Sequence, residues 1–203
     1  MKQNKPFAES CEQNKDAILA ILKDEFAGCH SIFEIGSGTG QHAVYFAEQM
    51  PWLNWQTSEV SQHHAGIQAW LDGSQCKNIS APIELDVTQP DHWPKQHYDG
   101  IFSANTAHIM SWSAVKAMFN SLPGIMKPGT IFCLYGPFNY DGQFTSESNA
   151  RFDMWLKSQS PEHGIRDFEA LNKLAEQADL RLKADHEMPA NNRILVWQQK
   201  SGA

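Results

Sequence analysis

Apolar residues recur along this chain in two patterns, one typical of helices and one typical of strands. The first helical face is formed by residues spaced i, i+3, i+4, i+7 and i+8, namely Ile18, Ile21, Leu22, Glu25 and Phe26. This spacing predicts a helix over roughly 16–27. Asp16 is placed to cap its amino end, and Gly28 is placed to stop it.

Short apolar runs and helical segments then alternate. We expect strands at 31–35, 54–60, 83–87, 98–104 and 130–138, and helices at 41–49, 62–71 and 113–122. Strands that are separated by helices of this length imply right-handed crossovers and a mostly parallel sheet with helices on both faces. The pattern therefore predicts a doubly wound α/β fold of the Rossmann-like kind.

The last third of the chain follows a different pattern. Two helices are expected at 145–157 and 167–178, followed by strands at 181–188 and 193–199. Because no helix separates those two strands, they should form an antiparallel hairpin at the end of a seven-stranded sheet. With 203 residues, of which 41% are hydrophobic, we expect residues 1–203 to form a single domain around one core.

Charge and composition disfavour several classes of function. Lys and Arg number 16 against 23 Asp and Glu, a net charge of −7, and no basic run is present, so nucleic acid is an unlikely partner. The four cysteines form no C-x-x-C pair and fit a reducing cytosol. No apolar stretch approaches the ~20 residues that span a bilayer, so we expect a cytoplasmic protein without a membrane segment.

Histidines are numerous, but their spacing does not suggest a metal site. His63 and His64 open a predicted helix, and His92 and His97 lie in a loop further along the chain. These residues lack an i, i+4 pairing and a companion cysteine cluster, so no metal is expected.

The strand-to-helix turn Gly36-Ser-Gly-Thr-Gly40 carries the first candidate chemistry. Glycines let a ligand approach the backbone closely, and the amides at the start of the following helix favour an anionic group such as a carboxylate. A dinucleotide fingerprint requires G-x-G-x-x-G or G-x-G-x-x-A, whereas Gln41 stands at the last position here. A nicotinamide-dependent oxidoreductase is therefore disfavoured, and a plain tight turn stays open as the alternative.

The run Glu34-Ile-Gly-Ser-Gly-Thr-Gly40 resembles the first motif of the class I S-adenosylmethionine-dependent methyltransferases. In that family the glycine loop wraps the methionine part of the cofactor. The resemblance thus implies S-adenosylmethionine as the cofactor, contacted by Glu34, Gly36, Ser37, Gly38 and Gly40.

Two carboxylates match further positions of this family. Glu59 ends the second predicted strand, about twenty residues after the glycine loop, where it can accept hydrogen bonds from both ribose hydroxyls. Asp86 matches the family position after the third strand, whose carboxylate accepts from the adenine amine, and Val87 offers a backbone amide nearby. A surface glutamate and a turn aspartate are the alternatives.

A narrower resemblance rests on five short strings: Glu12-Gln-Asn-Lys15, Gly40-Gln-His42, Tyr135-Gly-Pro-Phe138, Gly164-Ile-Arg-Asp167 and Met188-Pro-Ala-Asn-Asn192. They are similar to the methyltransferase-like 26 group, also known as domain-of-unknown-function family 938, over nearly the whole chain. This resemblance implies a methyltransferase fold and no particular substrate. Resemblance and placement also put Asn14 in a flap before the first helix, where its amide would reach the methionine part of the cofactor.

Methyl transfer requires an aligned acceptor and, where the acceptor carries a proton, a base. Ligands of open α/β sheets bind beyond the carboxyl ends of the strands, which points to residues 105–108 and 135–139. We assign Asn105 to the cofactor, His108 as the candidate base because imidazole titrates near neutrality, and Tyr135 as a residue that orients the acceptor. A packing histidine and a core aromatic residue are the alternatives.

The sequence favours a small-molecule acceptor. It lacks the Asn/Asp-Pro-Pro-Tyr and Pro-Cys signatures of adenine and cytosine methylation, and segments 105–112, 135–149 and 188–192 are rich in aromatic and amide side chains. We therefore predict an S-adenosylmethionine-dependent methyltransferase that acts on a modest, partly apolar molecule. The alternative is a non-catalytic binding or interaction protein of the same fold, and the oligomeric state does not follow from the sequence.

Overall fold

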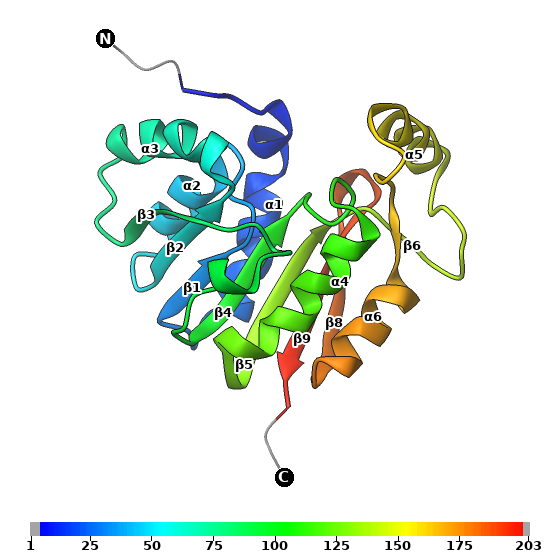
Figure 1. The fold of residues 1–203 in the computed structure, drawn as a ribbon. Coiled ribbons are helices and arrows are strands. Elements are labelled where there is room, and N and C mark those ends of the chain that lie inside the picture. The colour runs from blue at the N-terminus through cyan, green and yellow to red at the C-terminus, as the bar shows by residue number, and fades with distance from the viewer. Residues whose placement is uncertain (1–4, 201–203) are drawn as a thin grey trace.

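The chain folds into a seven-stranded sheet with helices on both of its faces (Figure 1). The computed structural model describes residues 5–200. Its helices are α1 (Glu9–Glu25), α2 (Gln41–Gln49), α3 (His64–Asp72), α4 (Trp112–Ser121), α5 (Glu147–Gln159) and α6 (Phe168–Gln177). Its strands are β1 (Ser31–Glu34), β2 (Asn54–Glu59), β3 (Ile79–Glu84), β4 (Tyr98–Ala104), β5 (Met126–Gly136), β6 (Phe138–Asn139), β7 (Arg166–Asp167), β8 (Leu180–Met188) and β9 (Asn192–Gln199).

The strand order of the large sheet is β3-β2-β1-β4-β5-β9-β8. The first five strands in that order pair in parallel, and β9 runs antiparallel to both β5 and β8. This order confirms the predicted doubly wound sheet with an antiparallel hairpin at its end. The chain runs outward from β1 to β3 and then returns to the other side of β1 as β4. Ligands of open α/β sheets bind beside such a reversal, so the ends of β1 and β4 are where a site is expected.

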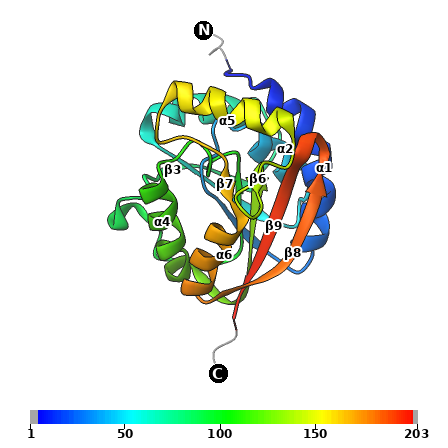
Figure 2. The same cartoon turned by 90° about the vertical axis from the view of Figure 1, so that its right-hand side faces the viewer.

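Successive side chains of the central strands enter two different hydrophobic cores. On β5, Cys133 and Tyr135 join the core beneath α1 and α2, whereas Phe132 and Leu134 join the core beneath α4 and α6. Because such strands are buried on both faces, they read in the sequence as continuous apolar runs. Helix α5 contributes to neither core and lies beyond the carboxyl end of the sheet in both views (Figures 1 and 2).

The first helix begins at Glu9, well before the predicted start near residue 16. Ala8 occupies the N-cap position and supplies no side-chain cap, so the true start carries none of the usual capping signal. Asp16 lies inside the helix and accepts a hydrogen bond of 2.5 Å from the Tyr45 hydroxyl. Asn14 also lies inside α1, so the prediction that it belongs to a flap before the first helix was wrong.

The third strand spans Ile79–Glu84 and was predicted too late, at 83–87. It is an edge strand that is partly exposed along its length, and for this reason it lacks a continuous apolar run. The apolar Leu85 lies just beyond it and still donates its amide to the Glu59 carbonyl at 3.0 Å. The short parallel pair of β6 and β7 was not predicted, because two residues per strand are too few to show a period.

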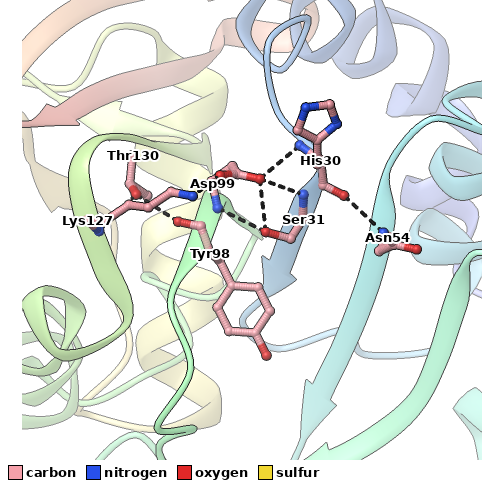
Figure 3. Close-up of polar contacts among 7 residues, drawn as sticks. All are labelled: His30, Ser31, Asn54, Tyr98, Asp99, Lys127 and Thr130. Carbon is pink, nitrogen blue, oxygen red and sulfur yellow. Dashed lines mark hydrogen bonds and ion pairs between the residues drawn. The ribbon is translucent and has the colours of Figure 1, made fainter.

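Polar residues join the amino-terminal ends of β1, β4 and β5 (Figure 3). Asp99 Oδ2 accepts hydrogen bonds from the backbone amides of His30 and Ser31, each at 2.9 Å, and Asp99 Oδ1 lies 2.5 Å from Lys127 Nζ. Partial burial raises the pKa of Asp99, but the Lys127 ammonium and the amide donors outweigh it and lower the pKa to about 2. The three strands are thus fastened together at the edge opposite to their carboxyl ends.

Asp99→Ala is expected to lower the free energy of unfolding by about 2 kcal/mol at neutral pH, because the amides of His30 and Ser31 lose a charged acceptor. Since the pKa is depressed in the folded protein, this stabilisation is present above the ordinary value of 3.8 and is lost as the pH falls through about 2. Urea unfolding at neutral and acidic pH measures both effects. Asp91→Ala, at an exposed turn, is the control, and equal neutral-pH midpoints for the two variants would contradict the prediction.

Candidate functional site

Two cavities adjoin at the carboxyl ends of β1, β2 and β4. The larger, of about 310 Å³, extends over β2 and the turn after β3. The smaller, of about 200 Å³, follows the glycine loop to the start of α1. Both are lined by Gly36, Glu59, Thr106 and Ile109, so they meet along a shared wall. We refer to the two cavities together as the trough.

The glycine loop forms one wall of the trough and has an unusual backbone. Gly36, Gly38 and Gly40 have φ angles of 72°, 56° and 87°. The Ser37 amide donates to the Ser58 carbonyl at 2.9 Å, which fixes the loop against β2. A Cβ on Gly36 would lie 2.6 Å from Thr106 Cγ2, whereas a Cβ on Gly38 would meet no protein atom within 4 Å. Because Gly38 lines the smaller cavity, its missing Cβ leaves room there for a ligand.

Glu34 lies at the base of the smaller cavity and is only 2% exposed. Its Oε2 accepts hydrogen bonds from Ser37 Oγ at 2.8 Å and from Trp55 Nε1 at 3.0 Å. Burial raises the pKa of the Glu34 carboxyl to about 7, against the lowering effect of these two donors. The carboxyl is therefore half ionised near neutral pH, and a cationic ligand beside it would favour the charged form.

Glu59 lies where the two cavities meet. Its Oε2 accepts a hydrogen bond from the Gly38 amide at 3.1 Å, and its Oε1 accepts one from the Val60 amide at 2.8 Å. These bonds orient the carboxylate without exhausting it, because each oxygen can accept more than one hydrogen bond. Glu59 therefore lies in the wall of both cavities with its carboxylate able to accept further hydrogen bonds.

Asp86 and Val87 line the larger cavity. Asp86 Oδ1 accepts from the Thr88 hydroxyl at 2.7 Å and from the Thr88 amide at 2.9 Å, and these bonds lower the pKa of Asp86. Asp86 therefore does stabilise a turn, which was the alternative to a role in binding. Both bonds use Oδ1, which leaves Oδ2 as an acceptor for a ligand, so the two roles are compatible.

Asn105 follows β4 and lines the smaller cavity. Its φ angle is 59°, in the left-handed region that non-glycine residues rarely adopt. The Asn105 amide donates to the Tyr135 carbonyl at 2.9 Å, and this bond helps to hold the strained conformation. Backbone strain of this kind concentrates at binding sites, where the surrounding structure enforces it.

His108 and Tyr135 do not line the trough. His108 is 6% exposed and packs against the Phe152 ring, and burial together with the charge of Arg166 lowers its pKa to about 4, so it is a weak base. Tyr135 is buried in the core beneath α1, where burial raises its pKa and a hydrogen bond with Asn14 opposes the rise. Their assigned roles, and that of Asn14, stay predictions.

For many of the residues that line the trough, the sequence predicted no individual role in binding the cofactor. These are Ala8, Ser10, Cys11, Thr39, His42, Val60, His63, Leu85, Met110 and Ala114, together with Thr106 and Ile109 of the shared wall. Thr106, Ile109 and Met110 follow β4, so the strand end indicated their place in the fold but not their individual contacts. Ile109 is 52% exposed, which puts an apolar side chain at the rim of the trough.

Other parts of the structure bear on the possible ligands. Residues 5–200 hold no group of three or more His, Cys, Asp and Glu side chains arranged to bind a metal ion. Over the same range, no helix combines the length and the apolar character that crossing a membrane requires. A further cavity of about 600 Å³, lined in part by Tyr140, Asn191 and Arg193, shares no lining residue with the trough.

Comparison with known proteins gives one family match and many structural matches. The model of the family described as "Protein of unknown function (DUF938)" matches residues 5–199. An O-methyltransferase family protein from Burkholderia thailandensis superposes with a TM-score of 0.76 at 14% identity, over 93% of this chain and 59% of that protein. Human N-acetylserotonin methyltransferase, solved with S-adenosylmethionine, has a TM-score of 0.80 at 14% identity, over 95% and 53% of the two chains.

An O-methyltransferase of neocarzinostatin biosynthesis was solved with S-adenosylmethionine and 2-hydroxy-5-methyl naphthoic acid. Its TM-score is 0.76 at 16% identity, over 94% of this chain and 54% of that protein. The present chain thus spans little more than half the length of the proteins that it superposes on. At these identities the likeness shows a shared methyltransferase fold.

Proposed function

This chain belongs to the DUF938 family of proteins of unknown function, and we propose that it binds S-adenosylmethionine in the trough and transfers the methyl group to a small-molecule acceptor. The observation that carries the proposal is the position of Glu59 at the junction of the two cavities, with Asp86 in the wall of one and the glycine loop in the wall of the other. Membership of the family agrees with the narrower resemblance seen in the sequence, whereas the likeness to the methyltransferase-like 26 group stays an expectation.

The residues of the trough fit the two halves of this cofactor. The larger cavity offers Asp86 to an adenine amine between the apolar side chains of Val60, Val87 and Met110. The smaller cavity offers the amides of the glycine loop to a carboxylate and the Glu34 carboxyl to an ammonium group. Glu59, at the junction, is placed to accept from ribose hydroxyls. The space beside Gly38, which a Cβ would fill, leaves room for a ligand against the loop.

In this proposal the protein contributes binding and alignment rather than covalent chemistry. When bound, the cofactor would supply an electrophilic methyl group carried on a sulfonium sulfur, which leaves as a neutral thioether. The glycine loop and Asn105 would position the methionine part, and Ile109, which lines both cavities, would present an apolar side chain at the rim. Holding the two reactants in line accounts for much of the catalysis of such a reaction. His108 would act as a base only for an acceptor that is acidic enough for its lowered pKa.

A small-molecule acceptor is supported by three observations. Ile109 exposes an apolar side chain at the rim of the trough, which suits a partly apolar molecule. The superposed proteins include a mitomycin 7-O-methyltransferase and N-acetylserotonin methyltransferase, whose names state small acceptors. The net charge of −7 argues in the same direction, because a nucleic acid would be repelled.

Calorimetric titration of S-adenosylhomocysteine tests the cofactor site. Glu59→Ala and Asp86→Ala are each expected to weaken binding about 10- to 100-fold, because each removes hydrogen bonds to a charged acceptor that are worth about 1.5–3 kcal/mol. Asp72→Ala, at the exposed end of α3, is the matched control and should bind like the wild type. A folded wild type that fails to bind at millimolar concentration would refute the proposal.

Turnover is a separate question from binding. Consumption of S-adenosylmethionine in the presence of a broad pool of small metabolites, followed as release of S-adenosylhomocysteine, is the expected result for an enzyme. Binding without turnover in such a pool would instead support a non-catalytic protein that keeps the cofactor site. The observation that favours this second function is that His108, the candidate base, is buried and lines neither cavity of the trough.

A further inference from the structure

The segment after β4 forms a wall of both halves of the trough, yet it makes few hydrogen bonds of its own. Within it, the amides of Ile109 and Met110 both donate to the Thr106 carbonyl, at 3.0 Å and 3.1 Å, which makes one isolated helical turn. A single turn leaves carbonyls at its end without helical partners, and it is not stable by itself. Something outside the segment must therefore hold its shape.

Arg166 supplies those missing partners from the distant strand β7. Its Nε donates to the Ala107 carbonyl at 2.9 Å, and its second terminal nitrogen, Nη2, donates to the Met110 carbonyl and, at 2.8 Å, to the Glu162 carbonyl. The planar guanidinium can reach several carbonyls at once because its donors point in fixed directions. Its positive charge also suits the carbonyl end of the turn.

The guanidinium of Arg166 interacts with these backbone carbonyls rather than with a carboxylate. Among residues 5–200, no carboxylate forms an ion pair with its guanidinium within 4.0 Å. The group is half buried, which lowers its pKa, and it lies 5.9 Å from the centre of the Trp112 ring. Next to it, the Gly164 amide donates to the His108 carbonyl at 2.9 Å, so the same segment makes a further bond to the loop.

From this geometry the structure assigns Arg166 as a positioning residue that holds loop 105–111, and through it Thr106, Ile109 and Met110, in the conformation that binds the cofactor. This inference rests on the proposed function. It does not require Arg166 to touch the ligand, since Arg166 does not line either cavity. Without the guanidinium, the loop would sample other conformations, and the apparent affinity would fall in proportion to the population that keeps the binding shape.

The test is calorimetric titration of S-adenosylhomocysteine into the wild type, Arg166→Lys, Arg166→Met and a control, Arg151→Met. Arg151 lies on the exposed face of α5 and pairs only loosely, at 3.7 Å, with Glu147. We expect about a tenfold or greater loss of affinity for Arg166→Met, a smaller loss for Arg166→Lys, which keeps the charge, and none for the control. In a further variant, Arg166→Ala, which leaves space for a small cation, millimolar methylguanidinium should restore part of the affinity, a rescue that a general loss of stability would not show.

Hydrogen exchange provides a readout that needs no ligand. The amides of Ile109 and Met110 should lose protection in the Arg166 variants while the amides of β4 and β5 keep theirs. Failure of the wild type to bind would overturn the proposed function and this inference with it. If the wild type binds, unchanged affinity and unchanged exchange in Arg166→Lys and Arg166→Met would overturn the inference alone. Should Arg166→Met fail to fold, Arg166→Lys decides between the outcomes.

Discussion

Gly36→Ala is expected to lower the free energy of unfolding by about 2–5 kcal/mol and to remove measurable cofactor binding. A left-handed conformation costs a residue with a Cβ about 1–2 kcal/mol, and forcing an extra methyl into a packed site costs about 1–3 kcal/mol. Both apply here, since Gly36 has a φ of 72° and its Cβ would lie 2.6 Å from Thr106 Cγ2. Thr106 cannot easily turn away, because its hydroxyl is bonded to Ser103 Oγ at 2.6 Å.

Gly38→Ala separates binding from stability. Its φ of 56° carries the conformational cost, but its Cβ would enter open space and would clash only with a ligand. We therefore expect a loss of about 1–2 kcal/mol in stability together with a loss of binding as severe as that of Gly36→Ala. Gly28→Ala, whose Cβ also meets nothing and whose φ is not left-handed, is the control. Urea unfolding and calorimetry measure the two quantities, and undiminished binding by Gly38→Ala would place the ligand elsewhere.

Glu34→Gln is expected to stabilise the protein at alkaline pH and to weaken cofactor binding there. The amide oxygen of glutamine can still accept from Ser37 Oγ and Trp55 Nε1, while the buried charge is gone. The folded-state pKa of Glu34 is raised from 4.5 to about 7. Its contribution to stability is therefore fully present below 4.5 and is lost as the pH rises through about 7. At 1.36 kcal/mol per unit, the difference between variant and wild type should grow to about 3 kcal/mol.

The binding half of this prediction has the opposite dependence on pH. A ligand ammonium beside Glu34 interacts with the ionised carboxyl, so the affinity of the wild type should rise through about pH 7 while that of Glu34→Gln stays flat. Urea unfolding and calorimetry on either side of that pH check both halves. Glu48→Gln, on the exposed side of α2, is the control. Parallel stability profiles for Glu34→Gln and the wild type would show that Glu34 is not the titrating group.

The sequence predicted those parts of the fold and of the candidate site that depend on local signals, such as glycines and the ends of strands. The glycine loop follows a short apolar strand, Glu59 ends the next predicted strand, and Asp86 lies near the end of the third, so their positions at the carboxyl edge could be predicted directly. The same reasoning failed for α1, because Ala8 gives no capping signal, and for β3, because an edge strand is not continuously apolar. These errors moved element boundaries by several residues without changing the topology.

The side-chain directions at the ends of β4 and β5 could not be predicted in the same way. A strand that is buried on both faces shows no alternation of polar and apolar residues, so the sequence of β5 does not reveal that Tyr135 faces α1. The hydrogen bonds from Arg166 to loop 105–111 could not be predicted from the sequence for a different reason. Arg166 is 59 residues away from Ala107 in sequence, and no local pattern encodes a contact over that separation.

The fastening of β1, β4 and β5 at Asp99 has a consequence for how a family with this fold can diversify. The bonds of Asp99 lie at one edge of the sheet (Figure 3), and the trough lies at the other. Distant sites that share no partners contribute to stability almost independently. Substitutions in the loops around the trough can therefore accumulate, and alter which molecule is accepted, while the opposite edge keeps the strands in register. Related proteins of this fold can therefore differ in the molecules that they bind while their central sheet stays the same.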